Sequence, residues 1–379
     1  MINFNFSKNC YSCSACMNIC PVRAISFDES CEPIIDKDLC VGCNRCNTVC
    51  PAINTQKTNT RIQGHGYLCQ NRDKQIVEKS SSGGLFYIFA MHILQMGGYV
   101  CGCIYDEYWQ TKHIITNKIE DVYKMMGSKY IKSNLGDCFE KIQDLLSSGS
   151  MVLFSGTPCQ IAGLKAIVGQ ACNLITVAVV CHGSIERDIW DYYLASETDS
   201  NDQIVGITMR DKSKGWLNYG MRFDYKSGKV KISYRNQDGY FLRAFTEGLL
   251  ERDICLNCAF KGNQINADLL IGDAWGFKES DLATENDKGM STVICLSQKG
   301  ESLLLSVSSQ IIMKNISLEQ IVSHNPRIVS PAEKNDDLER FRECIKKDPN
   351  NIKKYCKKFT TNTLFYRLIR KARRIKILR

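Results

Sequence analysis

The chain has 379 residues, of which 44% are hydrophobic and 23% are charged, and its formal net charge is +9. These values are ordinary for a globular protein, and the length is sufficient for two domains with a sizeable core in at least one of them. No run of about 18 uninterrupted apolar residues occurs, which argues against a transmembrane helix. The first residues lack the layout of a secretory signal, so the sequence predicts a cytoplasmic protein.

The composition is unusual in its 21 cysteines. In a small secreted protein this number would indicate disulfides, but the chain is long and shows no export signal. A reducing cytoplasm favours metal ligation or free thiols instead. The spacing of the cysteines distinguishes between these two outcomes.

Two cysteine-rich stretches near the N-terminus repeat with a period of 30 residues. Each has the pattern C-x2-C-x2-C-x3-C-P of bacterial ferredoxins that carry two [4Fe–4S] clusters, in which the fourth cysteine of each copy binds the other cluster. The predicted ligands are Cys10, Cys13, Cys16 and Cys50 for one cluster, and Cys40, Cys43, Cys46 and Cys20 for the other.

The alternative to these clusters is a pair of structural zinc sites, because C-x2-C pairs also bind zinc. Zinc sites rarely need four cysteines in so short a run, twice, each time followed by a proline, here Pro21 and Pro51. The prolines are expected to end short helical turns, and residues 24–27 and 33–36 to form short strands beside the clusters. Residues 1–55 are thus predicted to be a ferredoxin-like domain that transfers single electrons.

The remainder of the chain alternates between strand-like and helical patterns. Residues 56–64 are polar and predict a linker, and residues 65–330 predict a larger α/β domain with a mainly parallel sheet covered on both faces. Residues 204–235 become rich in β-strand patterns, which predicts an antiparallel insertion. Strands are expected at 67–69, 99–101, 151–154, 174–180 and 268–271, and helices at 85–96, 138–146, 161–168 and 185–194.

Two loops of this region contain small and hydrogen-bonding residues. The glycine pair of the first loop precedes a predicted helix, whose free N–H groups suit a phosphate, although such clusters are more often plain helix caps and turns. The second loop adds a lysine and a ring that could meet a cofactor, and its alternative is a surface turn. The loops are Ser80-Ser81-Ser82-Gly83-Gly84 and Gly127-Ser128-Lys129-Tyr130.

A second group of cysteines lies at predicted strand ends. Cys159 follows the turn Gly156-Thr157-Pro158 at the start of a helix, a position that stabilises a thiolate, and Cys181 ends the next strand in Cys-His-Gly. Together with the pair Cys255 and Cys258, these residues are enough for a third [4Fe–4S] cluster. Buried free thiols and a four-cysteine zinc site remain the alternatives.

These motifs, in this order, resemble the beta subunit of coenzyme F420-dependent hydrogenase and dehydrogenase, in the form with a ferredoxin domain fused in front. The resemblance rests on Ser-Ser-Gly-Gly at 81–84, Gly-Ser-Lys-Tyr at 127–130, Gly-Thr-Pro-Cys-Gln at 156–160 and Cys-His-Gly at 181–183. It continues in Met-Arg-Asp-Lys at 209–212, Gly-Trp at 215–216, the C-x2-C pair at 255–258, and the segment from 267 to Trp-Gly at 275–276.

The resemblance implies FAD beside a third cluster held by the second cysteine group, with the Ser/Gly, Gly-Ser-Lys-Tyr and Gly-Thr-Pro segments lining the flavin. Asp273 could orient the flavin or a cluster ligand, or could be a turn or helix cap. The implied function is an oxidoreductase that passes electrons from ferredoxin or another redox protein to a small-molecule acceptor of two electrons.

The acceptor is left open between coenzyme F420 and another organic compound, because related genes also lie beside genes of polysaccharide synthesis. Lys129, Arg210 and Lys212, together with Trp216, are the candidates for catalysis or for holding an anionic or planar substrate. Their alternative is an exposed position on a strand or turn. The alternative function is a non-catalytic electron-transfer subunit of a larger redox complex.

The C-terminal residues 331–379 are predicted to form a basic helical tail. Leu364, Leu368, Ala372 and Ile375 share one helical face, and such a helix could lie on an anionic membrane surface or bind an acidic partner. The alternative is a helix that docks on its own domain. Nucleic-acid binding is not expected, because the positive charge is concentrated in this tail and no nucleic-acid-binding motif is present.

Overall fold

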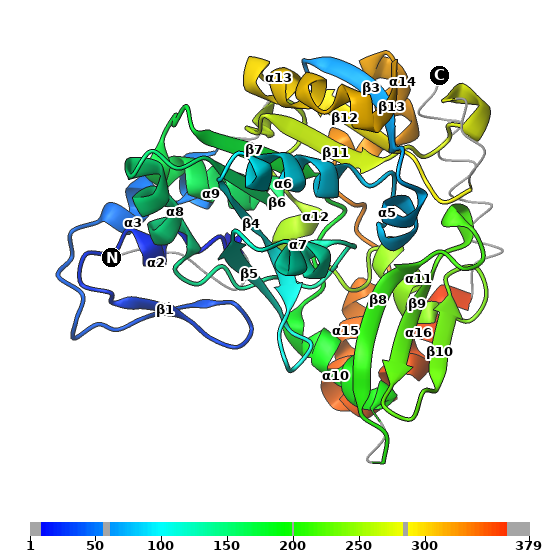
Figure 1. Cartoon of the computed structure of the whole chain (residues 1–379). Coiled ribbons are helices and arrows are strands. Elements are labelled where there is room, and N and C mark those ends of the chain that lie inside the picture. Colours follow the sequence, from blue (N-terminus) through cyan, green and yellow to red (C-terminus); the bar gives the residue numbers. More distant parts are fainter. Residues whose placement is uncertain (1–8, 56–60, 199–200, 283–286, 362–379) are drawn as a thin grey trace.

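A computed structural model describes residues 9–55, 61–198, 201–282 and 287–361 (Figure 1). The N-terminal part is built from two similar halves, as its 30-residue repeat predicts. Ser14 and Asn44, which occupy equivalent positions, both adopt left-handed backbone conformations immediately before a short helix. The elements are α2 (Ala15–Asn18), β1 (Ile25–Phe27), β2 (Pro33–Ile35), α3 (Arg45–Thr48) and α4 (Pro51–Asn54).

The strands β1 and β2 pair in antiparallel fashion, which confirms the two short strands expected from the sequence. Pro21 follows the end of α2, in agreement with the expected helical stop. Pro51 likewise follows the end of α3, and it also occupies the first turn of α4. Proline fits that position since the first helical N–H groups have no partner in the helix.

The larger part of the chain contains an eight-stranded mixed sheet with the order β13-β3-β12-β11-β7-β6-β4-β5. The prediction of a mainly parallel sheet is correct only for its centre, where β4, β6, β7 and β11 run parallel. Both outer parts are antiparallel. The strands are β3 (His65–Asn71), β4 (Tyr99–Tyr105), β5 (Thr111–Thr116), β6 (Val152–Gly156), β7 (Leu174–Val179), β11 (Leu269–Asp273), β12 (Ser291–Cys295) and β13 (Ile311–Asn315).

Helices cover both faces of this sheet, and consecutive strand residues enter different hydrophobic cores. Leu153 packs in the core with α6, whereas Phe154 packs in the core with α8 and α9. This follows from the two-residue period of a strand. The helices around the sheet are α5 (Lys74–Lys79), α6 (Leu85–Gln95), α7 (Ile119–Met125), α8 (Cys138–Ser147), α9 (Pro158–Val168), α13 (Gln298–Ser306) and α14 (Leu318–His324).

A three-stranded antiparallel sheet of order β10-β9-β8 confirms the predicted β-rich insertion. It packs with helices from before it, after it and near the C-terminus around a core that contains Trp190, Phe223 and Phe341. The elements are α10 (Arg187–Glu197), β8 (Ile204–Asp211), β9 (Gly220–Tyr225), β10 (Val230–Tyr234), α11 (Tyr240–Thr246), α12 (Asp253–Leu256), α15 (Leu338–Lys347) and α16 (Ile352–Thr361).

Short 3-10 helices join several of these elements. They are η1 (Trp216–Asn218), η2 (Gly262–Gln264), η3 (Glu279–Asp281), η4 (Ser308–Gln310), η5 (Pro326–Ile328) and η6 (Pro349–Asn351). Within the described ranges, no helix combines the length and hydropathy required to cross a membrane. The amphipathic segment predicted from Leu364 onward lies outside the described residues.

The ferredoxin-like part packs directly against the large sheet domain through α8 and α9. Asn18 donates a hydrogen bond to the Gly136 carbonyl oxygen over 2.9 Å and accepts one from the Glu140 main-chain N–H over 3.0 Å. A Cβ atom added at Gly163 of α9 would lie 2.9 Å from the Cys13 sulfur. The glycine is therefore what permits this close approach of helix and cysteine.

Candidate functional site

The eight cysteines of the ferredoxin-like repeat gather around two small cavities. Each cavity is lined by three cysteines of one repeat and the last cysteine of the other. This exchange is the arrangement expected from the spacing. The cavity that we call the inner site is lined by Cys10, Cys13, Cys16 and Cys50, and the one that we call the outer site is lined by Cys20, Cys40, Cys43 and Cys46.

A third group of cysteines begins with Cys159, which stands in the first turn of α9. Thr157 caps this helix in a reciprocal arrangement with Gln160, in which each side chain serves a main-chain N–H at the helix start. The Thr157 hydroxyl also lies 3.1 Å from the Cys159 sulfur. Cys159 therefore stands at the N-terminal end of a capped helix, where main-chain N–H groups and the helix dipole favour negatively charged groups.

Cys159, Cys181, Cys255 and Cys258 come from three parts of the chain and all line one larger cavity. Cys181 follows β7, and the C-x2-C pair spans the end of α12. Burial is the main cause that raises the pKa of the Cys181 thiol to about 12, and the neighbouring thiols Cys255 and Cys159 contribute in the same direction. Such thiols lose their protons readily only when a metal takes the place of the proton.

Among the residues that the structure describes, no three His, Cys, Asp or Glu side chains are close enough together to hold a single metal ion. Zinc binds its sulfur ligands about 2.3 Å from one atom, whereas a [4Fe–4S] cluster bonds each cysteine to a different iron.

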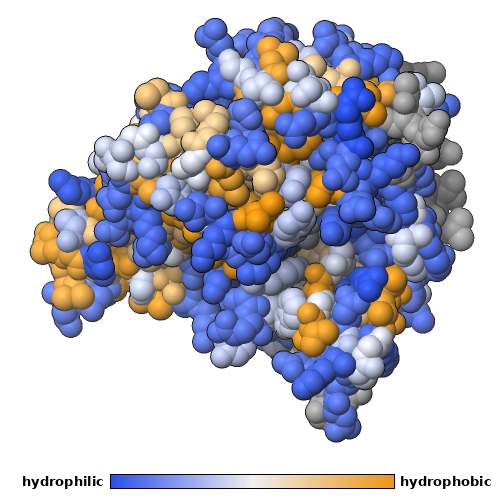
Figure 2. Space-filling model, viewed as in Figure 1, coloured by the Kyte–Doolittle hydropathy of each residue, from blue (hydrophilic) through white to orange (hydrophobic). Residues whose placement is uncertain are grey.

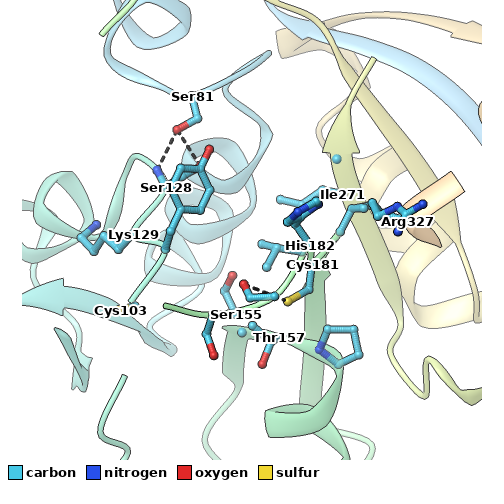
Figure 3. A pocket seen from close by; sticks show the side chains of 18 of the residues that line it. Ser81, Cys103, Ser128, Lys129, Ser155, Thr157, Cys181, His182, Ile271 and Arg327 are labelled. Atoms are coloured by element: carbon cyan, nitrogen blue, oxygen red, sulfur yellow. Dashed lines mark hydrogen bonds between the residues drawn. The ribbon is translucent and has the colours of Figure 1, made fainter. Parts of the chain in front are cut away.

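The larger cavity has a volume of about 400 Å³, which is within the usual range for small-molecule sites. The same cavity is lined by the two predicted loops, which the structure brings together. Figure 3 shows Ser81 joined to Ser128, whose N–H and hydroxyl lie 2.7 and 2.9 Å from the Ser81 oxygen. The predicted residues that line the cavity are Ser81, Ser82, Gly84, Gly127, Ser128, Lys129, Tyr130, Gly156, Thr157, Pro158, Arg210 and Asp273.

Three of the predicted residues do not line this cavity: Gly83, Lys212 and Trp216. Gly83 donates its main-chain N–H to the Ser291 hydroxyl. The ammonium group of Lys212 is buried beneath the Ser80–Ser82 loop, where it donates to the carbonyl oxygens of Val77 and Lys288. Lys212 thus stabilises the position of this loop from a place that does not line the cavity.

Lys129 lines the cavity, but its ammonium group serves the protein itself. It donates to the main-chain oxygens of Met125, Met126 and Gly127 at 3.0 to 3.3 Å. These carbonyls end α7, where a positive charge is favourable. In Figure 3 the side chain points away from Cys181 and His182.

Arg210 and Asp273 form a buried ion pair at the cavity wall. Two guanidinium nitrogens lie 3.0 and 3.2 Å from the Asp273 oxygens, and the guanidinium lies over the Tyr219 ring at 4.0 Å. The Arg210 side chain is 3% exposed, so the pair fixes the position of the carboxylate. Trp216 donates its indole N–H to the same carboxylate over 3.2 Å and stacks on Trp275.

Sequence reasoning missed several cavity residues that no motif identifies. Tyr11 lines both the inner site and the larger cavity, and its hydroxyl accepts a hydrogen bond from the Ala259 N–H over 3.1 Å. His113 is buried between strands, and burial holds its pKa at about 3. Lys132 and Arg252 are buried cations that also line the cavity. These residues can be recognised as cavity residues only from the folded structure, because their neighbours come from distant segments of the chain.

Comparison with known proteins finds two matching family models. Residues 149–320 match the model of the C-terminal part of the beta subunit of coenzyme F420 hydrogenase/dehydrogenase, and residues 9–54 match that of the 4Fe-4S dicluster domain.

Two curated relatives are similar to the chain at 24% identity. One is the coenzyme F420-dependent sulfite reductase of Methanocaldococcus jannaschii, matched over 328 residues, 82% of this chain and 47% of that protein. The other is the F component of the F(420)H(2) dehydrogenase of Methanosarcina mazei, matched over 243 residues, 58% of this chain and 65% of that protein. The chain therefore spans about half the length of the first relative.

Among solved structures, a chain of the F420-reducing [NiFe] hydrogenase complex from Methanosarcina barkeri is similar, with a TM-score of 0.48 and 15% identity. The similarity covers 79% of this chain and 93% of that one.

Proposed function

We propose that this protein is an iron–sulfur flavoprotein oxidoreductase, because residues 149–320 match the model of the C-terminal part of the beta subunit of coenzyme F420 hydrogenase/dehydrogenase and residues 9–54 match that of the 4Fe-4S dicluster domain. It exchanges electrons between a one-electron redox protein and a two-electron organic acceptor, through three [4Fe–4S] clusters and FAD. The observation that carries this proposal is the larger cavity, which is lined both by four cysteines and by hydrogen-bonding loops.

The arrangement of the three cysteine sets supports an order for electron transfer. Tyr11 lines both the inner site and the larger cavity, and Cys13 packs against Gly163, one turn along the helix that begins beside Cys159. The outer site shares no lining residue with the larger cavity. We call the set Cys159, Cys181, Cys255 and Cys258 the third site. We therefore propose the order outer site, inner site, third site and flavin.

The outer site is also where a redox protein has access. Cys43 is exposed, and exposed apolar side chains gather on the same domain, where Figure 2 shows hydrophobic residues at the left of the molecule. Exposed apolar groups of this kind mark interaction surfaces. The residues are Val22, Ile34, Leu39, Val41 and Ile53.

The loops of the larger cavity fit a flavin nucleotide. The Ser81–Ser128 pair and the Gly127 turn offer hydroxyl and main-chain groups, while Asp273 is fixed by Arg210. FAD bound there would supply the conversion between single electrons and electron pairs, which the clusters alone cannot perform. Coenzyme F420 is one candidate acceptor, and an organic compound linked to polysaccharide synthesis is another.

The test is the cofactor content of protein purified without oxygen. We expect about twelve iron and twelve acid-labile sulfides per chain, from three four-iron clusters, together with one FAD. A content of about eight iron atoms per chain without flavin would agree with the dicluster domain but would overturn the catalytic proposal. That result would favour the alternative of an electron-transfer subunit without a catalytic site of its own.

A second experiment replaces one cysteine of the third site. Cys258→Ser should lower the iron content by about four per chain while the spectra of the dicluster domain persist. The matched control is Cys172→Ser, because Cys172 is an exposed free cysteine outside the three sets and its loss should leave the iron content unchanged. An unchanged iron content in Cys258→Ser would contradict the third cluster.

A further inference from the structure

Tyr11 joins the segment of the inner site to the segment of the third site. It directly follows Cys10 in the chain, and its hydroxyl oxygen accepts a hydrogen bond from the Ala259 main-chain N–H over 3.1 Å. Ala259 in turn directly follows Cys258. A cysteine of the inner site and a cysteine of the third site are therefore connected by covalent bonds and a single hydrogen bond.

The position of Tyr11 is fixed by a second contact with the same segment. The tyrosine is 6% exposed, and its ring meets the ring of Phe260 edge to face, with 4.9 Å between the ring centroids. Aromatic pairs prefer this geometry. Two consecutive residues, Ala259 and Phe260, thus hold one tyrosine, the first through its hydroxyl and the second through its ring.

The contact between the inner site and α9 offers a less direct connection. Cys13 packs against Gly163, which lies four residues after Cys159 in the helix. This route contains a contact between atoms that are not bonded, followed by a turn of helix. Electrons couple more strongly through covalent bonds and hydrogen bonds than across a van der Waals contact, so the connection through Tyr11 is the stronger one.

We propose that Tyr11 is a positioning residue for electron transfer, whose hydroxyl carries the electronic coupling between the inner site and the third site. The inference rests on the proposed function, under which both sites hold clusters. One electron leaves the inner site and one enters the third site. The tyrosine is neither oxidised nor deprotonated, because its hydroxyl only accepts the hydrogen bond, and no covalent bond breaks.

The test is anaerobic reduction by reduced ferredoxin followed by freeze-quenched electron paramagnetic resonance, with the signals assigned through Cys16→Ser, Cys43→Ser and Cys258→Ser. In Tyr11→Phe, which keeps the ring and removes the hydroxyl, reduction of the third site should become several-fold slower. The outer and inner sites should be reduced at their normal rates, and the iron content and all midpoint potentials should stay unchanged. A merely structural role would alter the iron content or the potentials instead.

Two further variants separate the hydroxyl from the ring. Tyr67→Phe is the matched control, because Tyr67 is also buried and its hydroxyl also makes a hydrogen bond, to Glu301, but it does not line the larger cavity. It should leave every rate unchanged. Phe260→Leu removes the ring contact and keeps the Tyr11 hydroxyl, so the third site should be reduced nearly as fast as in the wild type. Slow reduction in Phe260→Leu with normal reduction in Tyr11→Phe would overturn the proposal.

Hydrogen exchange gives a measurement that does not depend on electron transfer. In Tyr11→Phe the Ala259 N–H loses its acceptor, and exchange mass spectrometry of the anaerobic protein follows the peptide that contains it. Because a hydrogen bond contributes about 1 kcal/mol, exchange of this N–H should become about fivefold faster, whereas Tyr67→Phe should not alter it. Unchanged exchange in Tyr11→Phe would overturn the proposal, since the hydroxyl would then not hold this segment.

The iron content separates failure of this inference from failure of the proposed function. About twelve iron per chain, with a normal rate for the third site in Tyr11→Phe, would overturn the role of Tyr11 alone. About eight iron per chain in the wild type would overturn the proposed function and the inference with it, because no third cluster would then receive electrons.

Discussion

Arg210 illustrates how a single residue predicted as catalytic can have a structural task. Its guanidinium is 3% exposed and paired with Asp273, and burial of the charge is offset chiefly by the attraction of that carboxylate, which keeps the pKa of Arg210 above its ordinary value. Substrate cannot displace this contact without removing the counterion of Asp273. The residue therefore shapes the cavity wall through Asp273.

We expect Arg210→Met to lower the free energy of unfolding by about 3 to 5 kcal/mol, because it leaves a carboxylate without its partner. Denaturant unfolding without oxygen measures this loss. Arg222→Met is the matched control, since Arg222 pairs with Asp224 at 2.7 Å but is 37% exposed, and exposed pairs contribute about 1 kcal/mol or less. Equal losses in the two variants would contradict the role assigned to Arg210.

Lys212 gives a prediction for the dependence of stability on pH. Burial, reinforced by the charge of Arg210, lowers the pKa of Lys212 to about 7, whereas an unfolded lysine has a pKa of about 10.4. Between these values the unfolded chain binds more protons, so this residue makes stability rise with pH.

The free energy of unfolding of the wild type should therefore increase relative to Lys212→Met between pH 7 and pH 10, by at most about 1.4 kcal/mol per pH unit. Unfolding of both proteins at pH 7, 8 and 9 measures the difference. A difference that is constant over this range would show that Lys212 stays fully charged in the folded protein.

At the scale of elements, α9 connects two cysteine sites. It begins beside Cys159 of the third site and packs through Gly163 against Cys13 of the inner site. A glycine inside a helix normally costs about 1 kcal/mol relative to alanine. Replacing a helical glycine by alanine therefore usually stabilises a protein. At Gly163 the close approach of Cys13 leaves no room for the alanine methyl group, so the same replacement should destabilise it.

We expect Gly163→Ala to destabilise the protein by about 1 to 3 kcal/mol through overpacking and to increase hydrogen exchange in α2 and α9. Thermal unfolding and exchange mass spectrometry measure these effects. Ala166→Val enlarges an exposed residue of the same helix and is the matched control, for which only a small change is expected. A stabilised Gly163→Ala would disprove the tight contact.

At the scale of the whole molecule, the ferredoxin-like domain presents its inner site to the large domain and its outer site to the surroundings. This arrangement predicts that the inner site is an obligatory step between a donor protein and the larger cavity. Cys16→Ser removes a ligand of the inner site. Electrons would then have to cross the longer gap from the outer site to the third site, so reduction of the third site by reduced ferredoxin should slow at least about tenfold. The outer site should still be reduced at its normal rate.

Freeze-quenched electron paramagnetic resonance measures both rates in one experiment. The matched comparison is Cys43→Ser, which removes a ligand of the outer site and should slow reduction of all remaining sites together. A normal rate for the third site in Cys16→Ser would indicate a direct route from the outer site and would contradict the proposed order.

The sequence by itself determined the features that depend on local spacing. The 30-residue repeat predicted both cysteine sets, and the structure gathers those same sets around two cavities. The strands of the sheet centre and the antiparallel insertion were also predictable, because two-residue and helical periodicities are properties of short segments. The strands β12 and β13 were not predicted, since both pair with β3 at the other end of the domain. The strand β5 was not predicted either, although it pairs with β4 directly before it.

Only the tertiary structure decided what each polar residue contacts. Lys129 and Lys212 have the same sequence signal as a substrate-binding lysine, yet their ammonium groups meet main-chain carbonyls, while Lys132 belongs to no motif and is left as a buried cation on the cavity wall. Likewise, Tyr11 joins the inner site to the larger cavity because residues far apart in sequence pack there. The strength of a charge depends on burial and on neighbours, and folding supplies both.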